Sequence, residues 1–363
     1  MNLKKWPMAV GLAIVVALIG AACGSKSGAS GGFKGVSITG AGATFPAPMY
    51  QTWSAAFLKV ESGAKVNYQS IGSGGGVQQF TSRTVDFGAT DVPLKTEEIA
   101  ALPDKNYIEF PTIMGGVVVA YNTQGVPDGL KLDGTTVADI FLGKVKSWND
   151  AEIASQNPGV SLPNTPIQVA HRSDESGTTS VFTTWLAKQS SQWQSKVGSG
   201  KAVQWPVGTG GNGNAGVAGV VHQTQGSVGY LSFDYAVSAG LSIAQIKAPD
   251  GSYVKASTDS ISAAGGNLSF PIQPDTNILD SSAPGAYPIA STTYILVYTN
   301  QTNKDKAQTL VDFWTWALTK GQAMATSINY APLPTSFAQQ ALGELAKVTV
   351  NGQQIHASAG IAS

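Results

Sequence analysis

Residues 171–179, with the sequence His-Arg-Ser-Asp-Glu-Ser-Gly-Thr-Thr, combine one guanidinium group with a turn of small and hydroxyl-bearing residues. The side chain of Arg172 offers a rigid fork of N–H donors that matches two oxygens of phosphate or sulfate. Ser176, Gly177 and Thr178 add hydroxyls and a backbone that can come close to a ligand. Apolar residues at 181, 182, 185 and 186 predict a helix here, so the turn would lie at a positive helix N-terminus. The run therefore predicts half of an oxyanion-binding site.

A plainer interpretation of the same residues stays open at this point. Ser176 or Thr178 would then only cap the helix, since serine and threonine are common N-caps. Arg172 would pair with Asp174 at the surface, where such pairs contribute little. The choice between the two interpretations depends on the rest of the chain.

Two earlier segments have the same design of a short strand, a turn of small residues and a helix. Residues 38–48 run from a strand pattern through Gly-Ala-Gly-Ala-Thr-Phe into a helix expected to begin near Pro46. Residues 66–71 form a second expected strand, which leads through the Gly-Ser-Gly-Gly-Gly turn at 72–76 into another helix pattern. One glycine-rich turn is weak evidence. Three turns of one chemical kind, together with an arginine, favour a shared anion site.

The N-terminus has the features of a secretory signal. Lys4 and Lys5 precede an apolar run over residues 8–19, and small residues at 20–22 lead into Cys23, which is the one cysteine among the 363 residues. The run is shorter than the roughly 20 residues that a membrane-spanning helix needs, although an uncleaved anchor stays an alternative. We expect a signal peptide over residues 1–22 and a lipidated Cys23. Residues 23–35 would form a flexible linker. Gly20 stands where the lipoprotein motif usually has leucine.

Composition limits the classes of function. Removal of residues 1–22 would leave 341 residues with a formal net charge of −2, because Lys4 and Lys5 leave with the segment. This length suggests two domains, and 42% apolar residues suffice for two cores. Charged residues make up 12% of the chain and no basic run is present, which argues against nucleic-acid binding. Anion specificity would have to come from local donors.

The strand and helix patterns alternate, as is typical of an α/β protein. Residues 116–121 and 294–298 are short apolar runs followed by Asn122 and Asn300, and they are candidates for crossings between two lobes. A helix is expected over residues 311–318, with its tryptophans in the core rather than on a carbohydrate platform. The glycine-rich run 208–216 lacks the Gly-Lys-Ser/Thr ending of a nucleotide phosphate loop.

Four motifs together resemble a known family. Residues 40–48, 71–76, 85–91 and 172–178 have the order and approximate spacing found in the extracytoplasmic phosphate-binding proteins of bacterial ABC phosphate uptake. The resemblance extends from about residue 36 to about residue 337. Matches at residues 110–112, 115–118 and 288–294 lie outside the ligand motifs.

The resemblance implies an α/β, two-lobed periplasmic-binding-protein fold of type II that binds a dehydrated phosphate in the cleft between the lobes. Residues 36–118 and 290–363 would form lobe I, and residues 119–289 would form lobe II. The phosphate-binding residues that it implies are Thr44, Phe45, Ser73, Asp91, Arg172, Ser176, Gly177 and Thr178, with Asp174 holding the arginine fork in place. Two positions depart from the family pattern. Gly74 stands where serine is frequent, and Glu175 stands where glycine is common; unless Glu175 points into solvent, its charge should weaken anion binding.

Asp91 is the residue that the resemblance makes decisive for ligand choice. At neutral pH phosphate retains a proton and sulfate does not, and a buried carboxylate can accept a hydrogen bond only from an oxygen that carries a proton. A site of this kind can reject a close analogue by about 10⁴-fold. Without the resemblance, Asp91 would be interpreted as a turn or cap residue before Pro93.

The expected function is therefore high-affinity capture of inorganic phosphate outside the cytoplasmic membrane and delivery to an ABC permease with its cytoplasmic ATPases. We expect a monomer without cofactor or metal that is held at the membrane by a lipid anchor. One alternative is the same fold used for sulfate, phosphonate or arsenate. Another is a secreted phosphoester hydrolase that uses Ser73 or Ser176 with His171 or His222, although no Gly-x-Ser-x-Gly elbow is in place and no metal-ligand cluster is visible among three histidines.

Overall fold

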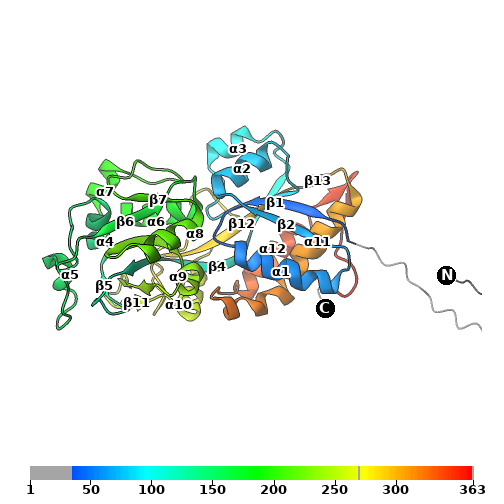
Figure 1. The fold of residues 1–363 in the computed structure, drawn as a ribbon. Helices are drawn as coiled ribbons and strands as arrows, with labels where there is room; N and C mark the ends of the chain where they lie inside the picture. Colours follow the sequence, from blue (N-terminus) through cyan, green and yellow to red (C-terminus); the bar gives the residue numbers. More distant parts are fainter. Residues whose placement is uncertain (1–34, 269, 362–363) are drawn as a thin grey trace, which may run out of the picture. The chain divides into compact units, whose positions relative to one another are not determined.

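The structure is a computed structural model that describes residues 35–268 and 270–361. The expected signal segment, Cys23 and the linker up to residue 34 lie outside the described residues. Contacts join the described residues into one compact unit. Within this unit two groups of helices lie on two halves of a central sheet (Figure 1). The α/β character predicted from the sequence is present.

The central sheet connects the two lobes. Its strand order over the described residues is β2-β1-β3-β12-β4-β8-β6-β7, with β9 also paired to β4. Strands β1, β2 and β3 are parallel in one half, and β6, β7 and β8 are parallel in the other. The long strands β4 and β12 run antiparallel to each other in the middle. This arrangement brings the carboxyl ends of the parallel strands in each half toward the middle of the protein, where ligands bind in open α/β sheets.

The first lobe contains the half of the sheet that β1, β2, β3 and β12 form, together with a small sheet of three short strands. Its strands are β1 (Ile38–Gly42), β2 (Val66–Ser70), β3 (Phe87–Thr90), β12 (Ala290–Tyr298), β13 (Asn300–Gln301), β14 (Thr349–Val350) and β15 (Gln353–Gln354). Its α-helices are α1 (Ala47–Val60), α2 (Ser73–Thr81), α3 (Thr96–Ala101), α11 (Lys304–Leu318) and α12 (Thr335–Leu345), and two 3₁₀ helices span Lys320–Met324 and Thr326–Ile328. The tryptophans of α11 are buried in the core, as the sequence predicted.

The second lobe contains the half of the sheet that β6, β7, β8 and β9 form, with a second small sheet. Its strands are β5 (Lys131–Leu132), β6 (Gln168–Arg172), β7 (Thr209–Gly211), β8 (Ser227–Ser232), β9 (Ser242–Ile243), β10 (Gln245–Lys247) and β11 (Tyr253–Lys255). Its helices are α4 (Gly134–Phe141), α5 (Ala151–Ala154), α6 (Gly177–Gln189), α7 (Ser191–Lys196), α8 (Gly213–Gln223), α9 (Phe233–Ser238) and α10 (Thr258–Ala264), followed by a 3₁₀ turn at Gly265–Asn267.

Strand β4 (Tyr107–Asn122) belongs to both halves of the sheet. Its residues up to Gly116 pair with β12, and from Val117 onward they pair with β8 and β9. Residues 294–298 lie in β12, which pairs with β3 and β4 in the first half. The lobe boundaries expected at 118/119 and 289/290 stay a prediction. No helix in the described ranges is long and apolar enough to cross a membrane.

Candidate functional site

The expected site residues lie where four strands end. Strand β1 leads into Thr44 and Phe45 at the start of α1, and β2 leads into Ser73, the first residue of α2. Strand β3 ends next to Asp91, while β6 ends at Arg172, just before the start of α6. The first N–H groups of a helix have no acceptor within the helix, so these starts present donors to whatever lies between them. The three strand-turn-helix units predicted from the sequence are all present.

In the first lobe, Ser73 and Asp91 are held together. The hydroxyl oxygen of Ser73 accepts a hydrogen bond from the backbone N–H of Asp91 at 3.2 Å. Ser73 is fully buried and Asp91 is 3% exposed. The hydroxyl of Ser291 on β12 donates to the backbone oxygen of Asp91. These bonds hold the backbone of Asp91 against the start of α2 and against β12.

In the second lobe, Arg172 is buried and already paired. Its Nε donates to Oδ1 of Asp174 at 2.8 Å and its Nη2 donates to Oδ2 at 2.5 Å. Burial alone would raise the pKa of Asp174, but the hydrogen bonds and charge of Arg172 lower it below its ordinary value. The plainer interpretation placed this pair at the surface, whereas the Arg172 side chain is 1% exposed. Because Nε and Nη2 are both bound to Asp174, the third nitrogen of the guanidinium, Nη1, is held in a fixed direction.

Each lobe forms one wall of the site, and Ser176 belongs to the second wall, formed by the second lobe. Its hydroxyl oxygen accepts from the backbone N–H of Thr179 at 3.1 Å, so it is the N-cap of α6. The hydroxyl hydrogen is still available for another acceptor. Capping and ligand binding are therefore compatible at this residue, and the two interpretations of the sequence do not exclude each other.

The two walls meet at Gly177. A Cβ atom added to Gly177 would lie 2.5 Å from Oγ of Ser73 and 2.8 Å from Oδ2 of Asp91. No side chain fits at such distances, and only glycine lets the start of α6 approach the first lobe this closely. The structure is therefore a closed arrangement in which residues from both lobes surround a common point.

Thr44 connects the lobes on the other side of the site. Its hydroxyl oxygen accepts from the side-chain amide of Asn214 at 2.8 Å, and its backbone oxygen accepts from the hydroxyl of Tyr235 at 3.0 Å. Asn214 also lies 3.4 Å from the hydroxyl of Thr178. Phe45 is buried, and its backbone oxygen accepts from Tyr330 at 2.5 Å. The structure thus brings all eight expected residues, and Asp174, into one region.

The sequence reasoning missed Asn214 and Tyr235. Asn214 is fully buried in the first turn of α8, within the glycine-rich run 208–216. The lack of a Gly-Lys-Ser/Thr ending argues only against a nucleotide loop in that run. The run also has the pattern of the other three turns, which is a short strand that leads through small residues into a helix. This pattern could have indicated a fourth turn at the site.

Two buried polar atoms of the described residues, one from each lobe, lack a partner in this region. Within the described part of the chain, Oδ1 of Asp91 and Nη1 of Arg172 have no hydrogen-bond partner although both are buried. Burial raises the pKa of the Asp91 carboxyl to about 7, while the Thr293 hydroxyl and the charges of Arg172 and Lys201 lower it. Unpaired buried groups are rare in proteins, and a free acceptor together with a free cationic donor suits an anion that carries a proton.

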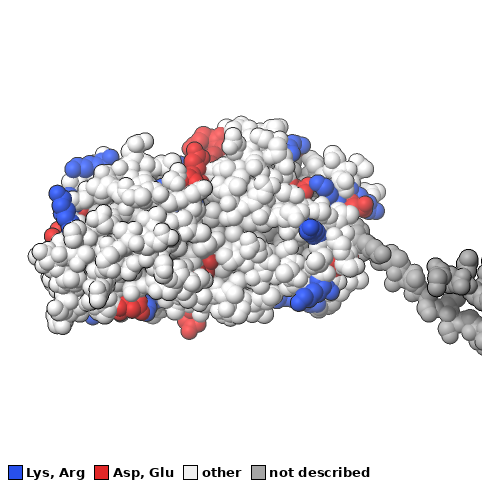
Figure 2. Space-filling model, in the orientation of Figure 1, with Lys and Arg blue, Asp and Glu red and all other residues white. Residues whose placement is uncertain are grey.

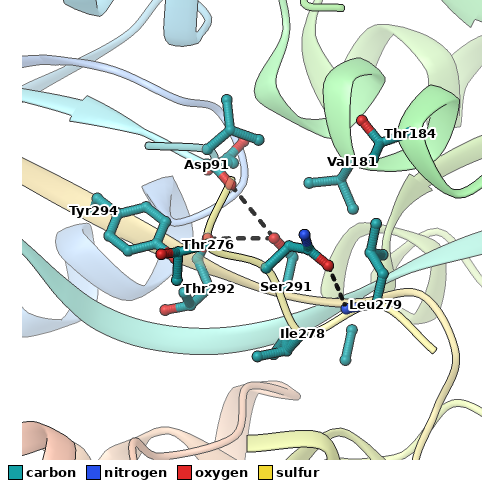
Figure 3. Close-up of a pocket in the computed structure, with 12 residues that line it drawn as sticks. Asp91, Val181, Thr184, Thr276, Ile278, Leu279, Ser291, Thr292 and Tyr294 are labelled. Carbon is teal, nitrogen blue, oxygen red and sulfur yellow. Dashed lines mark hydrogen bonds between the residues drawn. The ribbon is translucent and has the colours of Figure 1, made fainter. Parts of the chain in front are cut away.

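A small cavity adjoins Asp91 between the two lobes (Figure 3). It has a volume of about 40 Å³ and lies between α6, the segment around Ile278 and the first residues of β12. In Figure 3, Val181 and Thr184 of α6 face it from one side, and Ser291 and Thr292 of β12 face it from the other. Arg172, Ser73 and Ser176 are not among the residues that line it, so it is a gap beside the proposed site and not the anion site itself.

The two departures from the family pattern face each other across the cleft. The backbone N–H of Gly74 donates to the backbone oxygen of Glu175 at 3.0 Å. A Cβ atom on Gly74 would lie 2.2 Å from Oε2 and 2.4 Å from Cβ of Glu175. Glu175 is exposed, so solvent reaches its charge. Its side chain therefore lies where a side chain at position 74 would lie in the closed form.

The groups that a hydrolase would need are not assembled. His171 stacks on Trp205 with ring centroids 5.0 Å apart, and its Nδ1 lies 3.0 Å from the backbone oxygen of Arg172. In the ranges that the structure describes, neither His171 nor His222 has a hydrogen bond to Ser73 or Ser176. The same ranges contain no group of acidic, histidine or cysteine side chains that could hold a metal ion.

The chain is similar to known proteins over most of its length. The model of the PBP superfamily domain matches residues 25–320. The phosphate-binding protein PstS of Xylella fastidiosa strain 9a5c is 43% identical over 312 residues, which cover 85% of this chain and 84% of that protein. The PstS protein of Haemophilus influenzae is 42% identical over 301 residues, covering 82% and 89%.

Solved structures show the same fold. The phosphate-bound periplasmic protein PfluDING aligns with a TM-score of 0.66 at 21% identity, covering 84% of this chain and 92% of that one. The phosphate-binding protein of Stenotrophomonas maltophilia aligns with a TM-score of 0.65 at 20% identity, covering 85% and 93%. The predicted two-lobed α/β fold is therefore confirmed. The chain belongs to the PBP superfamily and, within it, to the family of PstS phosphate-binding proteins.

Proposed function

We propose that this protein captures inorganic phosphate outside the cytoplasmic membrane and delivers it to an ABC permease driven by cytoplasmic ATPases. The observation that carries the proposal is the pair of buried, unpaired atoms, Oδ1 of Asp91 and Nη1 of Arg172, in one closed site. The names of the relatives, which are phosphate-binding proteins, support the choice of anion.

The proposed binding set combines charge with many neutral donors. Nη1 of Arg172 would bind one phosphate oxygen while Asp174 keeps the guanidinium in place. The other donors would be the backbone N–H groups of Thr44 and Phe45, the hydroxyl and N–H of Ser73, and the groups of Ser176, Gly177 and Thr178. Fixed donors in a site without water give a dehydrated anion hydrogen bonds that replace its hydration shell.

The carboxylate of Asp91 would make the site selective. It accepts a hydrogen bond from the protonated oxygen of phosphate, whereas sulfate has no proton to give and is repelled. Because Asp91 is buried, an unpaired contact with sulfate is not relieved by solvent. The proposed ligand is accordingly a tetrahedral anion that keeps a proton at neutral pH.

Ligand binding would close the two lobes. The contacts of Thr44 with Asn214 and Tyr235 and of Gly74 with Glu175 cross the cleft, so they exist only when the lobes approach. A ligand that binds donors from both walls stabilises this closed form relative to an open one. The closed form would be the form that docks on the permease.

The proposal also includes the cellular placement expected from the sequence. A signal segment at residues 1–22 would export the chain, and lipid on Cys23 would hold the monomer near the permease and raise its local concentration. The protein would bind phosphate without converting it, as its relatives are named for binding.

Calorimetric titration of phosphate-stripped protein tests the proposal. We expect one-to-one binding of phosphate, with sulfate weaker by at least about 10³-fold. A chromogenic phosphomonoester should stay intact under the same conditions. Absence of phosphate binding, or equal affinity for sulfate, would overturn the proposed ligand, and turnover of the ester would overturn the binding role.

A further inference from the structure

One ion pair joins the two lobes at the rim of the site. Nζ of Lys201 lies 2.5 Å from Oε1 of Glu98. Lys201 lies between α7 and β7 in the second lobe, and Glu98 lies on α3 in the first. The Lys201 side chain is 8% exposed and that of Glu98 is 21% exposed. The other ion pairs among the described residues each lie within one lobe.

Lys201 is connected directly to the second wall of the site. Its backbone oxygen accepts from the backbone N–H of Ser176 at 2.8 Å, and Ser176 is the N-cap of α6. The same residue therefore fixes the start of α6 through its backbone and reaches the opposite lobe through its side chain. A movement of Lys201 moves the helix start that carries Gly177 and Thr178.

Glu98 is fixed on its own lobe before the lobes meet. Its Oε2 accepts from the backbone N–H of Lys95 at 2.9 Å, which gives a partner to an N–H group at the start of α3. Lys95 follows Asp91 closely along the chain, four positions later. The carboxylate is thus held at a set position near the site, and only Lys201 has to arrive for the pair to form.

The surroundings of this pair are acidic. Figure 2 shows Asp and Glu side chains gathered at the border of the two lobes beside α2 and α3. Glu97 in α3 is exposed, as is Glu175. Lys201 also lowers the pKa of Asp91 and of Glu109, which burial raises. Lys201 is therefore a second positive charge close to the anion site, held among carboxylates.

We propose that Lys201 and Glu98 form a latch between the lobes that exists only in the closed form and sets the rate at which phosphate leaves. The inference rests on the proposed function, since a latch on ligand release requires a ligand and closure around it. In the open form Glu98 keeps its bond from the Lys95 N–H and Lys201 is in water, so neither group hinders the first encounter with phosphate.

The energetics favour an effect on release over an effect on capture. Two charges that leave water lose much of their hydration, so the complete pair adds little net stability. Removal of one partner leaves the other charge buried and unpaired in the closed form, which favours opening. Differences in affinity between variants of one site are mostly differences in dissociation rate.

The experiment measures release of ³²P-labelled phosphate into excess unlabelled phosphate for the unaltered protein, Lys201→Gln, Glu98→Gln and the double variant. The Glu98→Gln variant keeps the bond from the Lys95 N–H, because the amide oxygen of glutamine also accepts, so the fold of α3 is retained. We expect each single variant to release phosphate at least about fivefold faster. The double variant should be slower than the product of the two effects, and association rates should stay within about twofold.

Lys255→Gln is the matched control, because the Lys255–Asp128 pair is exposed and lies within the second lobe. It should release phosphate at the rate of the unaltered protein. Normal release from Glu98→Gln, or effects of the two single variants that multiply fully in the double variant, would overturn the latch. If the unaltered protein binds no phosphate, the proposed function fails first, and the latch fails with it as a control of phosphate release.

Discussion

The two walls of the cleft each contain an aspartate, and the two aspartates have opposite properties. In the second lobe, the hydrogen bonds and charge of Arg172 outweigh burial and lower the pKa of Asp174. In the first lobe, burial outweighs Thr293, Arg172 and Lys201 and raises the pKa of Asp91 to about 7. Asp174 is a fixed anion that orients a cation, whereas Asp91 is an acid whose charge opposes closure without a suitable partner. Under the proposed function, the second wall would attract anions and the first wall would select among them.

The largest expected effect comes from removing the cation of the second wall. Arg172→Met should weaken phosphate binding by at least about 10³-fold, because truncation of one member of a buried charge pair typically costs about 2–5 kcal/mol or more. Calorimetric titration measures the loss. The double variant Arg172→Met with Asp174→Asn should bind equally weakly, which shows that the loss is not due to an unpaired Asp174. Arg83→Met, at an exposed pair in the first lobe, is the control and should bind normally.

The next effect concerns selection and not attraction. Asp91→Asn should reduce the ratio of phosphate to sulfate affinity by about 10³-fold, because the amide no longer repels sulfate and can donate to it. Competition of each anion against labelled phosphate gives the ratio. An unchanged ratio in this variant would assign selectivity to another residue and break the division between the two walls.

Local patterns in the sequence were enough to predict the strand-turn-helix units of both walls. The reason is that a buried strand, a turn of small residues and an N-cap such as Ser176 are encoded by adjacent residues. The positions of Arg172 and Asp174 followed in the same way, since they are two residues apart. Selectivity by Asp91 depended on the resemblance, because nothing adjacent to it in the sequence indicates burial.

Contacts between the lobes could not be predicted from the sequence. Asn214 meets Thr44 across 170 residues, and Lys201 meets Glu98 across 103 residues. Such pairs depend on how far the lobes close, which no local pattern encodes. Glu175 is a further example, since the sequence left open whether its side chain points into solvent or weakens anion binding. Only its place beside Gly74 in the structure indicates why both positions differ from the family.

A smaller effect is expected where the walls touch. Gly74→Ser should weaken phosphate binding about tenfold, because its Cβ would lie 2.2 Å from Oε2 of Glu175 in the closed form. Glu175→Gly should change affinity by less than about threefold, since an exposed charge is screened by water and salt. The double variant should bind as the unaltered protein does, as titration can show. Full loss in the double variant would mean that position 74 acts within its own lobe.

The smallest effect is on closure without ligand, and its sign follows from the pKa of Asp91. Burial in the closed form raises that pKa from 3.8 to about 7, so the closed form binds the proton more tightly than an open form in which Asp91 is in water. Protonation of Asp91 therefore stabilises the closed form most below about pH 4. This stabilisation is lost as the pH rises to about 7, and above that pH the balance between open and closed forms no longer depends on Asp91. Between pH 6 and pH 8 the equilibrium between open and closed forms should shift by on the order of tenfold.

Energy transfer between dyes on Lys59→Cys in α1 and Gln194→Cys in α7, in a Cys23→Ser background, measures this shift in phosphate-free protein. Both positions are exposed and lie in different lobes. Asp91→Asn should close more readily at pH 8 and should lose most of the pH dependence, because its amide does not titrate. An equal pH dependence with and without Asp91 would place the titrating group elsewhere. Asp91 would then select among anions without opposing closure, and the two walls would differ in specificity alone.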